Sequence, residues 1–177
     1  MRDGKRTDVI GLLGPLRRYA RSLTRDESQA EDLVQDTLVR AYERRSTFRP
    51  GGNLRGWLLS ILHNTFIDDR RRHAAEARRA QSLAEHVESS TPAGQESRVR
   101  LQQVQQAFLS LPEEQRAVLH LVAIEGLSYQ EAAATLDIPI GTLMSRLGRA
   151  RAALRAFEAG DDLTQSTSAR PRPTSGS

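Results

Sequence analysis

Apolar residues recur every three or four positions along most of the chain, which is the spacing of one face of an α-helix. This pattern predicts a first helix within residues 9–23, where Pro15 either kinks the helix or occupies its first turn. A second helix is predicted from Ser28, because Ser28 and Glu31 have the spacing of a capping box. Its expected buried stripe consists of Ala30, Leu33, Val34, Leu38, Ala41 and Tyr42.

A third helix is predicted after the chain break "RPGGN" at residues 49–53, since Asn53 is a favourable N-cap residue. The pattern ends in the basic run "RRRH" at residues 70–73. The apolar face of this helix consists of Leu54, Trp57, Leu58, Ile61, Leu62 and Phe66. The three helices together predict one helical domain over residues 8–74.

Apolar content then falls, and residues 75–98 are interpreted as a linker whose start is compatible with helix. Further helices are predicted near residues 99–109 and from residue 113 to a stop before Gly126. A second domain is therefore expected over residues 99–157. The tail at residues 158–177 has little to bury and is predicted to be disordered. No segment is predicted to be a strand, so the expected fold is all-α with two small helical domains.

The end of the second domain has the pattern of a helix-turn-helix. Ser128 and Glu131 form a second capping box, and Asp137-Ile138-Pro139 is a turn before a helix over about residues 140–156. The residues expected to pack the two helices together are Leu127, Ala132, Ala133, Leu136, Ile138, Leu143 and Leu147. The residues expected to face outward are Thr142, Met144, Ser145, Arg146, Gly148 and Arg149. Such a helix fits the DNA major groove, although a helical hairpin with a solvated basic end has the same pattern.

Charge and composition limit the classes of function that fit this chain. The formal net charge is +4, and residues 1–75 hold most of the excess of arginine over acid, so a polyanionic partner is plausible. The chain has no cysteine, and its histidines lack metal-site spacing, so no metal or cofactor is expected. It has neither a signal-peptide pattern nor a membrane-spanning apolar run, which predicts a cytoplasmic protein without membrane insertion. Enzymatic activity is disfavoured, because the acidic pairs sit at predicted helix ends or in the tail without a partner base.

The segment "FRPGGNLRGWLLSILHNTFIDDRRRH" at residues 48–73 combines aromatic rings, amides and arginines. This combination suits unstacked bases, which need stacking partners and hydrogen bonds to their edges. The simpler interpretation is that Trp57 and Phe66 belong to the core, since both fall on the apolar stripe. We favour the core interpretation for Trp57 and Phe66, and nucleic-acid binding for Phe48 and Asn64.

Three segments in order resemble the bacterial extracytoplasmic-function group of RNA polymerase sigma factors. "AEDLVQDTLVRAY" is similar to the core-polymerase-binding helix of that family, and "FRPGGNLRGWLLSILHNTFID" to its −10 element segment. "LPEEQRAVLHLVAIEGLSYQEAAATLDIPIGTLMSRLGRARAAL" resembles its −35-binding domain. The amino-acid sequence of the −10 segment is most similar to that of the general-stress members of the family. The resemblance implies a non-enzymatic transcription initiation subunit with sigma region 2 and sigma region 4. Its implied partners are core RNA polymerase (the β′ clamp helices and the β subunit), promoter DNA and an anti-sigma factor.

The resemblance also implies roles for individual residues. Three residues match the family positions that contact the polymerase clamp: Asp32, Gln35 and Asp36. Without the resemblance, they are simply the polar side of an amphipathic helix. Matching the −10 element positions are Phe48, Asn53, Asn64, Arg70 and Arg71. Matching the −35 recognition helix are Thr142, Met144, Ser145, Arg146 and Arg149. Met144 and Gly148 depart from the family pattern, so no −35 sequence is inferred.

Two other functions fit part of the sequence. A stand-alone helix-turn-helix regulator would bind an operator without polymerase, but it leaves the "EDLVQD" helix and the Phe48–Asn64 segment unexplained. An all-helical scaffold protein with a basic surface is the third interpretation. Binding to core RNA polymerase separates the sigma factor from both.

Overall fold

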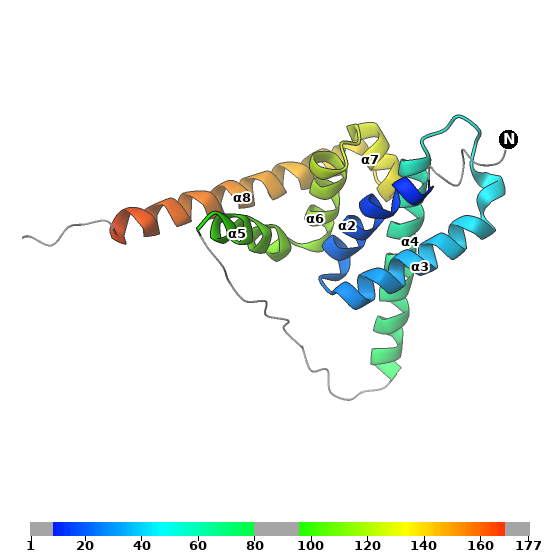
Figure 1. Ribbon diagram of the computed structural model, residues 1–177, viewed down its shortest axis with the longest axis horizontal. Coiled ribbons are helices and arrows are strands. Elements are labelled where there is room, and N and C mark those ends of the chain that lie inside the picture. Colours follow the sequence, from blue (N-terminus) through cyan, green and yellow to red (C-terminus); the bar gives the residue numbers. More distant parts are fainter. Residues whose placement is uncertain (1–8, 80–95, 169–177) are drawn as a thin grey trace, which may run out of the picture.

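The computed structural model of the chain describes residues 9–79 and 96–168, and all regular elements in these ranges are helical, which confirms the all-α prediction. In chain order they are α2 (Leu13–Thr24), α3 (Glu27–Glu43), the 3₁₀ turn η1 (Arg45–Thr47), α4 (Leu54–Arg79), α5 (Glu96–Ser110), α6 (Glu113–Leu119), the π-helical turn η2 (His120–Ile124), α7 (Tyr129–Leu136) and α8 (Ile140–Ser168). Helices α2–α4 form the first domain and α5–α8 form the second. Figure 1 shows the two domains side by side.

The start of α3 differs from the prediction. Asp26 is the N-cap, and its Oδ1 accepts a hydrogen bond of 2.8 Å from the backbone N–H of Gln29. Ser28 lies inside the helix, and Glu31 forms an ion pair of 2.9 Å with Arg17 of α2. The predicted capping box of Ser28 and Glu31 is therefore wrong. An aspartate two residues earlier caps the helix instead, so α3 begins two residues earlier than a Ser28 cap would allow.

The buried stripe of α3 differs from the prediction at Thr37 and at Tyr42. Thr37 is fully buried, and its hydroxyl donates a hydrogen bond of 2.7 Å to the carbonyl of Leu33. The stripe runs through Ala30, Leu33, Val34, Thr37 and Ala41. Tyr42 is 69% exposed, and its ring lies against the guanidinium of Arg45 at 4.3 Å. Tyr42 follows Ala41 directly, so the helix turns it about 100° away from the core.

Helix α4 crosses the first domain and contributes Leu58, Leu59, Ile61, Leu62 and Phe66 to its core. Asn53 caps it as predicted, since Asn53 Oδ1 accepts a hydrogen bond of 3.0 Å from the N–H of Gly56. Buried leucines such as Leu58 and Leu62 each contribute about 1.5–3 kcal/mol by leaving water. The helix continues to Arg79, so its predicted end at residues 70–73 is wrong. Residues 74–79 contain no glycine or proline that would stop it. The predicted linker residues 80–95 lie outside the described residues.

Pro15 of the first domain lies in the first turn of α2, which is one of its two predicted positions.

The second domain follows the predicted order of helices. Between α7 and the preceding segment, Ser128 and Glu131 form the predicted capping box, with hydrogen bonds of 3.2 and 2.9 Å. Helix α8 extends to Ser168. The prediction of a disordered tail is therefore wrong for residues 158–168, while residues 169–177 lie outside the described residues.

The join between η2 and α7 brings the two domains together. Gly126 has a φ of +67°, a conformation that side-chain-bearing residues rarely adopt, and it ends the helical run. The N–H of Glu125 bonds back to the carbonyl of His120 at 3.0 Å. The turn thereby points Glu125 toward the first domain. Helices α6 and η2 lie against α2, and α7 lies against the start of α4 (Figure 1).

Candidate nucleic-acid interface

The predicted polymerase-contacting residues share the exposed side of α3. Asp32, Gln35 and Asp36 are all exposed, whereas Leu33 and Val34 between them are buried. Asp32 and Asp36 also line a cleft of about 1070 Å³ where the start of α3 meets the ends of α2 and α4 and the start of α6. The cleft includes Arg116, so these acids lie close to the second domain.

Phe48 and Asn64 are brought to one side of the first domain by α4. The ring of Phe48 lies 5.2 Å from that of Trp57, tilted by 52°. Asn64 follows Trp57 by two helical turns, which places it on the same face, and it is exposed. Phe66 is buried and Trp57 is partly buried against the core, so the core interpretation of these two rings is confirmed.

The other polar groups of this segment have partners. Asn53 Nδ2 donates a hydrogen bond of 2.9 Å to Glu131 of α7. Arg70 forms an ion pair with Glu113 of α6, while Arg71 is exposed. Two of the five predicted −10 residues, Asn53 and Arg70, therefore lie at the boundary between the two domains.

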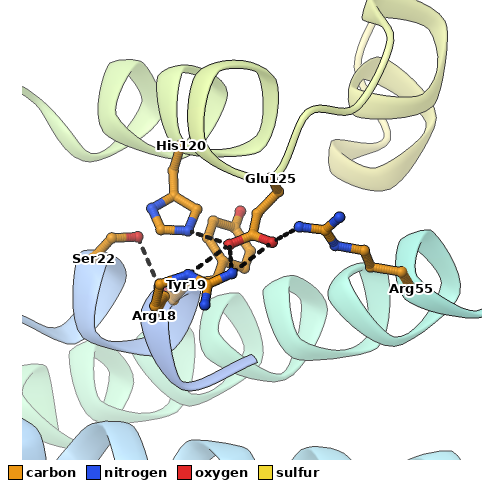
Figure 2. Close-up of polar contacts among 6 residues, drawn as sticks. All are labelled: Arg18, Tyr19, Ser22, Arg55, His120 and Glu125. Atoms are coloured by element: carbon orange, nitrogen blue, oxygen red, sulfur yellow. Dashed lines mark hydrogen bonds and ion pairs between the residues drawn. The ribbon is translucent and has the colours of Figure 1, made fainter. Parts of the chain in front are cut away.

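His63 lies apart from the Phe48–Asn64 face. Its Nδ1 is 3.0 Å from the hydroxyl of Tyr19, which is itself fully buried. Burial, together with the smaller effect of the positive charge of Arg146, lowers the pKa of His63 from 6.5 to about 4. The neutral imidazole is thus part of the folded structure. Figure 2 shows Tyr19 on α2, in the same close-up as His120 and Glu125.

The predicted recognition helix has the expected orientation at the start of α8. Leu143 and Leu147 are buried against the second domain. Outward from them, Met144, Ser145, Gly148 and Arg149 are exposed, while Thr142 and Arg146 are partly buried. Two of these side chains have partners within the domain. Arg146 pairs with Glu114 at 2.9 Å, and Arg149 donates a hydrogen bond of 2.8 Å to Ser145.

Comparison with known proteins identifies both domains. The sigma-70 region 2 family matches residues 11–76, and the sigma-70 region 4 family matches residues 101–154. The ECF RNA polymerase sigma factor EcfG of Rhodopseudomonas palustris is 38% identical over 155 residues, which are 88% of this chain and 85% of that protein. The chain belongs to the extracytoplasmic-function sigma factors.

Solved structures agree with this assignment. The sigma factor RpoE of Bartonella quintana, in complex with the anti-sigma factor NepR, has a TM-score of 0.76 and 34% identity, covering 87% of this chain and 96% of that chain. CnrH, in complex with the cytosolic domain of CnrY, has a TM-score of 0.62 and 31% identity, covering 90% and 92%. A sigma factor is a non-enzymatic initiation subunit that directs core RNA polymerase to promoters. Among the described helices of this one, none is long and apolar enough to cross a membrane.

Sequence reasoning missed a charged cluster between the two domains of the sigma factor. Glu125, whose side chain is fully buried, pairs with Arg55 of α4 and with Arg18 of α2 at 3.2 Å. It also accepts from His120 Nε2 at 3.2 Å. Figure 2 shows the Glu125 carboxylate pointing from the end of η2 toward the two arginines of the first domain. A lone acid directly after the apolar run "AVLHLVAI" was the available signal.

The partners of Glu125 reverse the effect of its burial. Burial by itself raises the pKa of this carboxyl. Hydrogen bonds from His120 and Arg55, together with the charges of Arg55 and Arg18, outweigh it and lower the pKa from 4.5 to about 2. The carboxylate is therefore charged at neutral pH and held by cations of the other domain.

A second missed contact is the buried guanidinium of Arg116 in α6. Its Nε donates to the carbonyl of Ser22, and its Nη2 to that of Leu23 at 3.3 Å. These carbonyls belong to the last turn of α2, where helix geometry leaves no intrahelical donor. Nη1 donates to the carbonyl of Leu111 at 2.6 Å. An arginine of the second domain thus caps a helix of the first.

The buried imidazole of His63 makes stability depend on pH. Its folded-state pKa lies below the unfolded value of 6.5, so the unfolded chain binds the proton first. The free energy of unfolding should therefore fall as pH decreases from about 6.5 to about 4. Between pH 7 and pH 5 the loss due to His63 should be about 1–2 kcal/mol. Urea unfolding followed by circular dichroism at the two pH values measures it.

The comparison for this prediction is between His63→Gln and His73→Gln. His63→Gln should lose less stability on acidification than the wild type, by that amount. His73→Gln removes an exposed imidazole and should keep the wild-type difference. Equal pH dependence in His63→Gln and the wild type would show that His63 is not held neutral.

Proposed function

We propose that this sigma factor binds core RNA polymerase through the exposed side of α3, opens the −10 element with the Phe48–Asn64 face, and recognises the −35 element with the start of α8. In this assignment residues 8–74 bind polymerase and the −10 element, and residues 99–157 bind the −35 element. The observation that supports it most is the orientation of α8. Its exposed Ser145 and Arg149 lie opposite the buried Leu143 and Leu147.

The proposed −10 site rests on chemistry suited to an unpaired base. Phe48 offers a partly buried ring beside a glycine-containing loop, and Asn64 offers a free amide on the adjoining face. Asn53, Arg70 and Arg71 flank this face. Asn53 and Arg70 contact the second domain, so they become available to DNA only when the domains separate.

We also propose an anti-sigma factor as a partner, and the cytoplasm, where polymerase acts, as the location. RpoE and CnrH were both solved with proteins bound to them, NepR and the cytosolic domain of CnrY. Their similarity to this chain over most of its length supports a regulator of the same kind. The interpretation as a stand-alone operator-binding regulator has no observation in its favour.

The polymerase contact is tested by reversing charge on α3. Asp32→Arg/Asp36→Arg should weaken binding to core polymerase at least about tenfold, because two carboxylates facing the clamp become two cations. Exposed substitutions of this kind shift folding stability by about 0.5 kcal/mol or less. Affinity is measured by fluorescence anisotropy with purified core enzyme. The control, Glu76→Arg/Glu158→Arg, makes the same charge change at exposed positions outside α3. Equal loss in both variants would mean that only net charge matters.

The −10 assignment is tested by promoter melting. Phe48→Ala should reduce permanganate reactivity of −10 thymines about tenfold, since stacking on an aromatic ring is worth about 1–3 kcal/mol per base. Asn64→Ala should act in the same direction, while binding to duplex promoter DNA changes less. Tyr42→Ala removes an aromatic ring that is more exposed than Phe48 and is the control. Normal melting in Phe48→Ala contradicts the assignment.

The −35 assignment is tested by selection on a randomised −35 pool at two salt concentrations. Arg146→Ala should cost about 1–3 kcal/mol and relax preference at one position. Arg155→Ala, farther along α8, should weaken all sequences alike and reduce the salt dependence by about one charge. Met144→Ala should matter only where a thymine methyl is within reach. If all three variants lose the same affinity without a change in sequence preference, α8 makes only electrostatic contacts with the DNA and does not recognise its sequence.

A further inference from the structure

The first domain, at the edge of its proposed −10 face, touches the helix-turn-helix of the second domain in this structure. Asn53, beside the −10 face, is hydrogen-bonded to Glu131 at 2.9 Å, and Glu131 begins the helix-turn-helix. The centres of a −10 and a −35 element are about 25 base pairs apart, which is roughly 85 Å of B-form DNA at 3.4 Å per base pair. Domains in this contact cannot occupy both elements at once. The arrangement is therefore a closed form of the protein.

The Glu125 cluster has the properties of the contact that holds this form. Its carboxylate belongs to the second domain, and two of its three partners, Arg18 and Arg55, belong to the first. Several other polar contacts across the boundary, such as those of Asn53 and Arg70, are exposed, and exposed pairs contribute little. Arg116 makes a second buried contact, but with neutral backbone carbonyls of α2. Removing one member of a buried charge pair, in contrast, is strongly destabilising.

We propose that Glu125 is an intramolecular latch, and that this sigma factor must break the Glu125 cluster before it can bind both promoter elements. The consequence for promoter binding rests on the proposed function, whereas the latch itself rests on the contacts between the domains. The latch makes the unbound chain favour the closed form without any second protein.

Two features of the Glu125 cluster favour its opening. Arg18 and Arg55 are 52% and 34% exposed, so they regain water easily when the domains part. Two buried nitrogens at the boundary, Arg55 Nε and His120 Nδ1, have no hydrogen-bond partner among the described residues. Separation would hydrate both. The desolvation of the charges offsets much of their mutual attraction, so the closed form is favoured without being permanent.

The test measures the distance between the domains in the full chain. Because the sequence has no cysteine, Ser46→Cys and Ala152→Cys place one spin label on each domain at exposed positions. Double electron–electron resonance should give one short, narrow distance distribution for otherwise wild-type protein. Glu125→Gln should reduce the ratio of closed to open molecules about tenfold or more and add longer distances.

Two further variants make the result specific. Asp68→Asn breaks the 3.3 Å ion pair with Arg40 inside the first domain and should leave the distances unchanged. Arg18→Gln/Arg55→Gln removes both cations of the first domain and should open the chain as Glu125→Gln does, even if Glu125→Gln proves poorly folded by circular dichroism. Wild-type distances in folded Glu125→Gln or in the arginine variant overturn the latch.

Run-off transcription with limiting sigma factor tests the consequence. Glu125→Gln should raise transcript yield relative to the wild type and Asp68→Asn, because more molecules are open. Longer distances without a higher yield would overturn the claim that closure restrains promoter binding. The distance measurement uses no polymerase or DNA, so errors in the proposed DNA-contacting residues leave it unaffected.

Discussion

A carboxylate can be buried only where other groups replace the water it loses, and Glu125 meets that condition across a domain boundary. The apolar core is one cluster that continues through both domains, and the charge of Glu125 is compensated only when the second domain lies on α2 and α4. Arg116 works in the same way, since its guanidinium satisfies carbonyls at the end of α2. Together with the apolar packing between the domains, these two charged side chains fix how the domains lie against each other.

This interface shapes how the functional surfaces are presented. The polar side of α3 and the outward side of α8 are open, whereas Asn53 and Arg70 are engaged with the second domain. The proposed binding surfaces are therefore not equally accessible: those on α3 and α8 are exposed, whereas part of the −10 surface is covered by the second domain. Interfaces that rely on charge can close and open repeatedly, because water compensates separated charges far better than it does exposed apolar surface.

Local patterns predicted the helices well and their ends less well. The Ser128–Glu131 capping box formed as expected, because both residues act within one helical turn. The same motif at Ser28 and Glu31 did not form. Asp26 caps the helix instead, and Glu31 forms an ion pair with Arg17. Helix α4 ran past its predicted end, since a charged run without glycine or proline does not stop a helix.

By itself the sequence determined the all-helical fold, the helix-turn-helix and the family, because apolar spacing, capping residues and motif order are properties of neighbouring positions. It could not show that Glu125 pairs with Arg18 and Arg55, which lie 107 and 70 positions away. An arginine on a helix surface has the same local pattern whether it faces water or a buried acid. Only the packing of α6 and η2 on the first domain decided which charges became partners, because burial depends on elements that are distant in the chain.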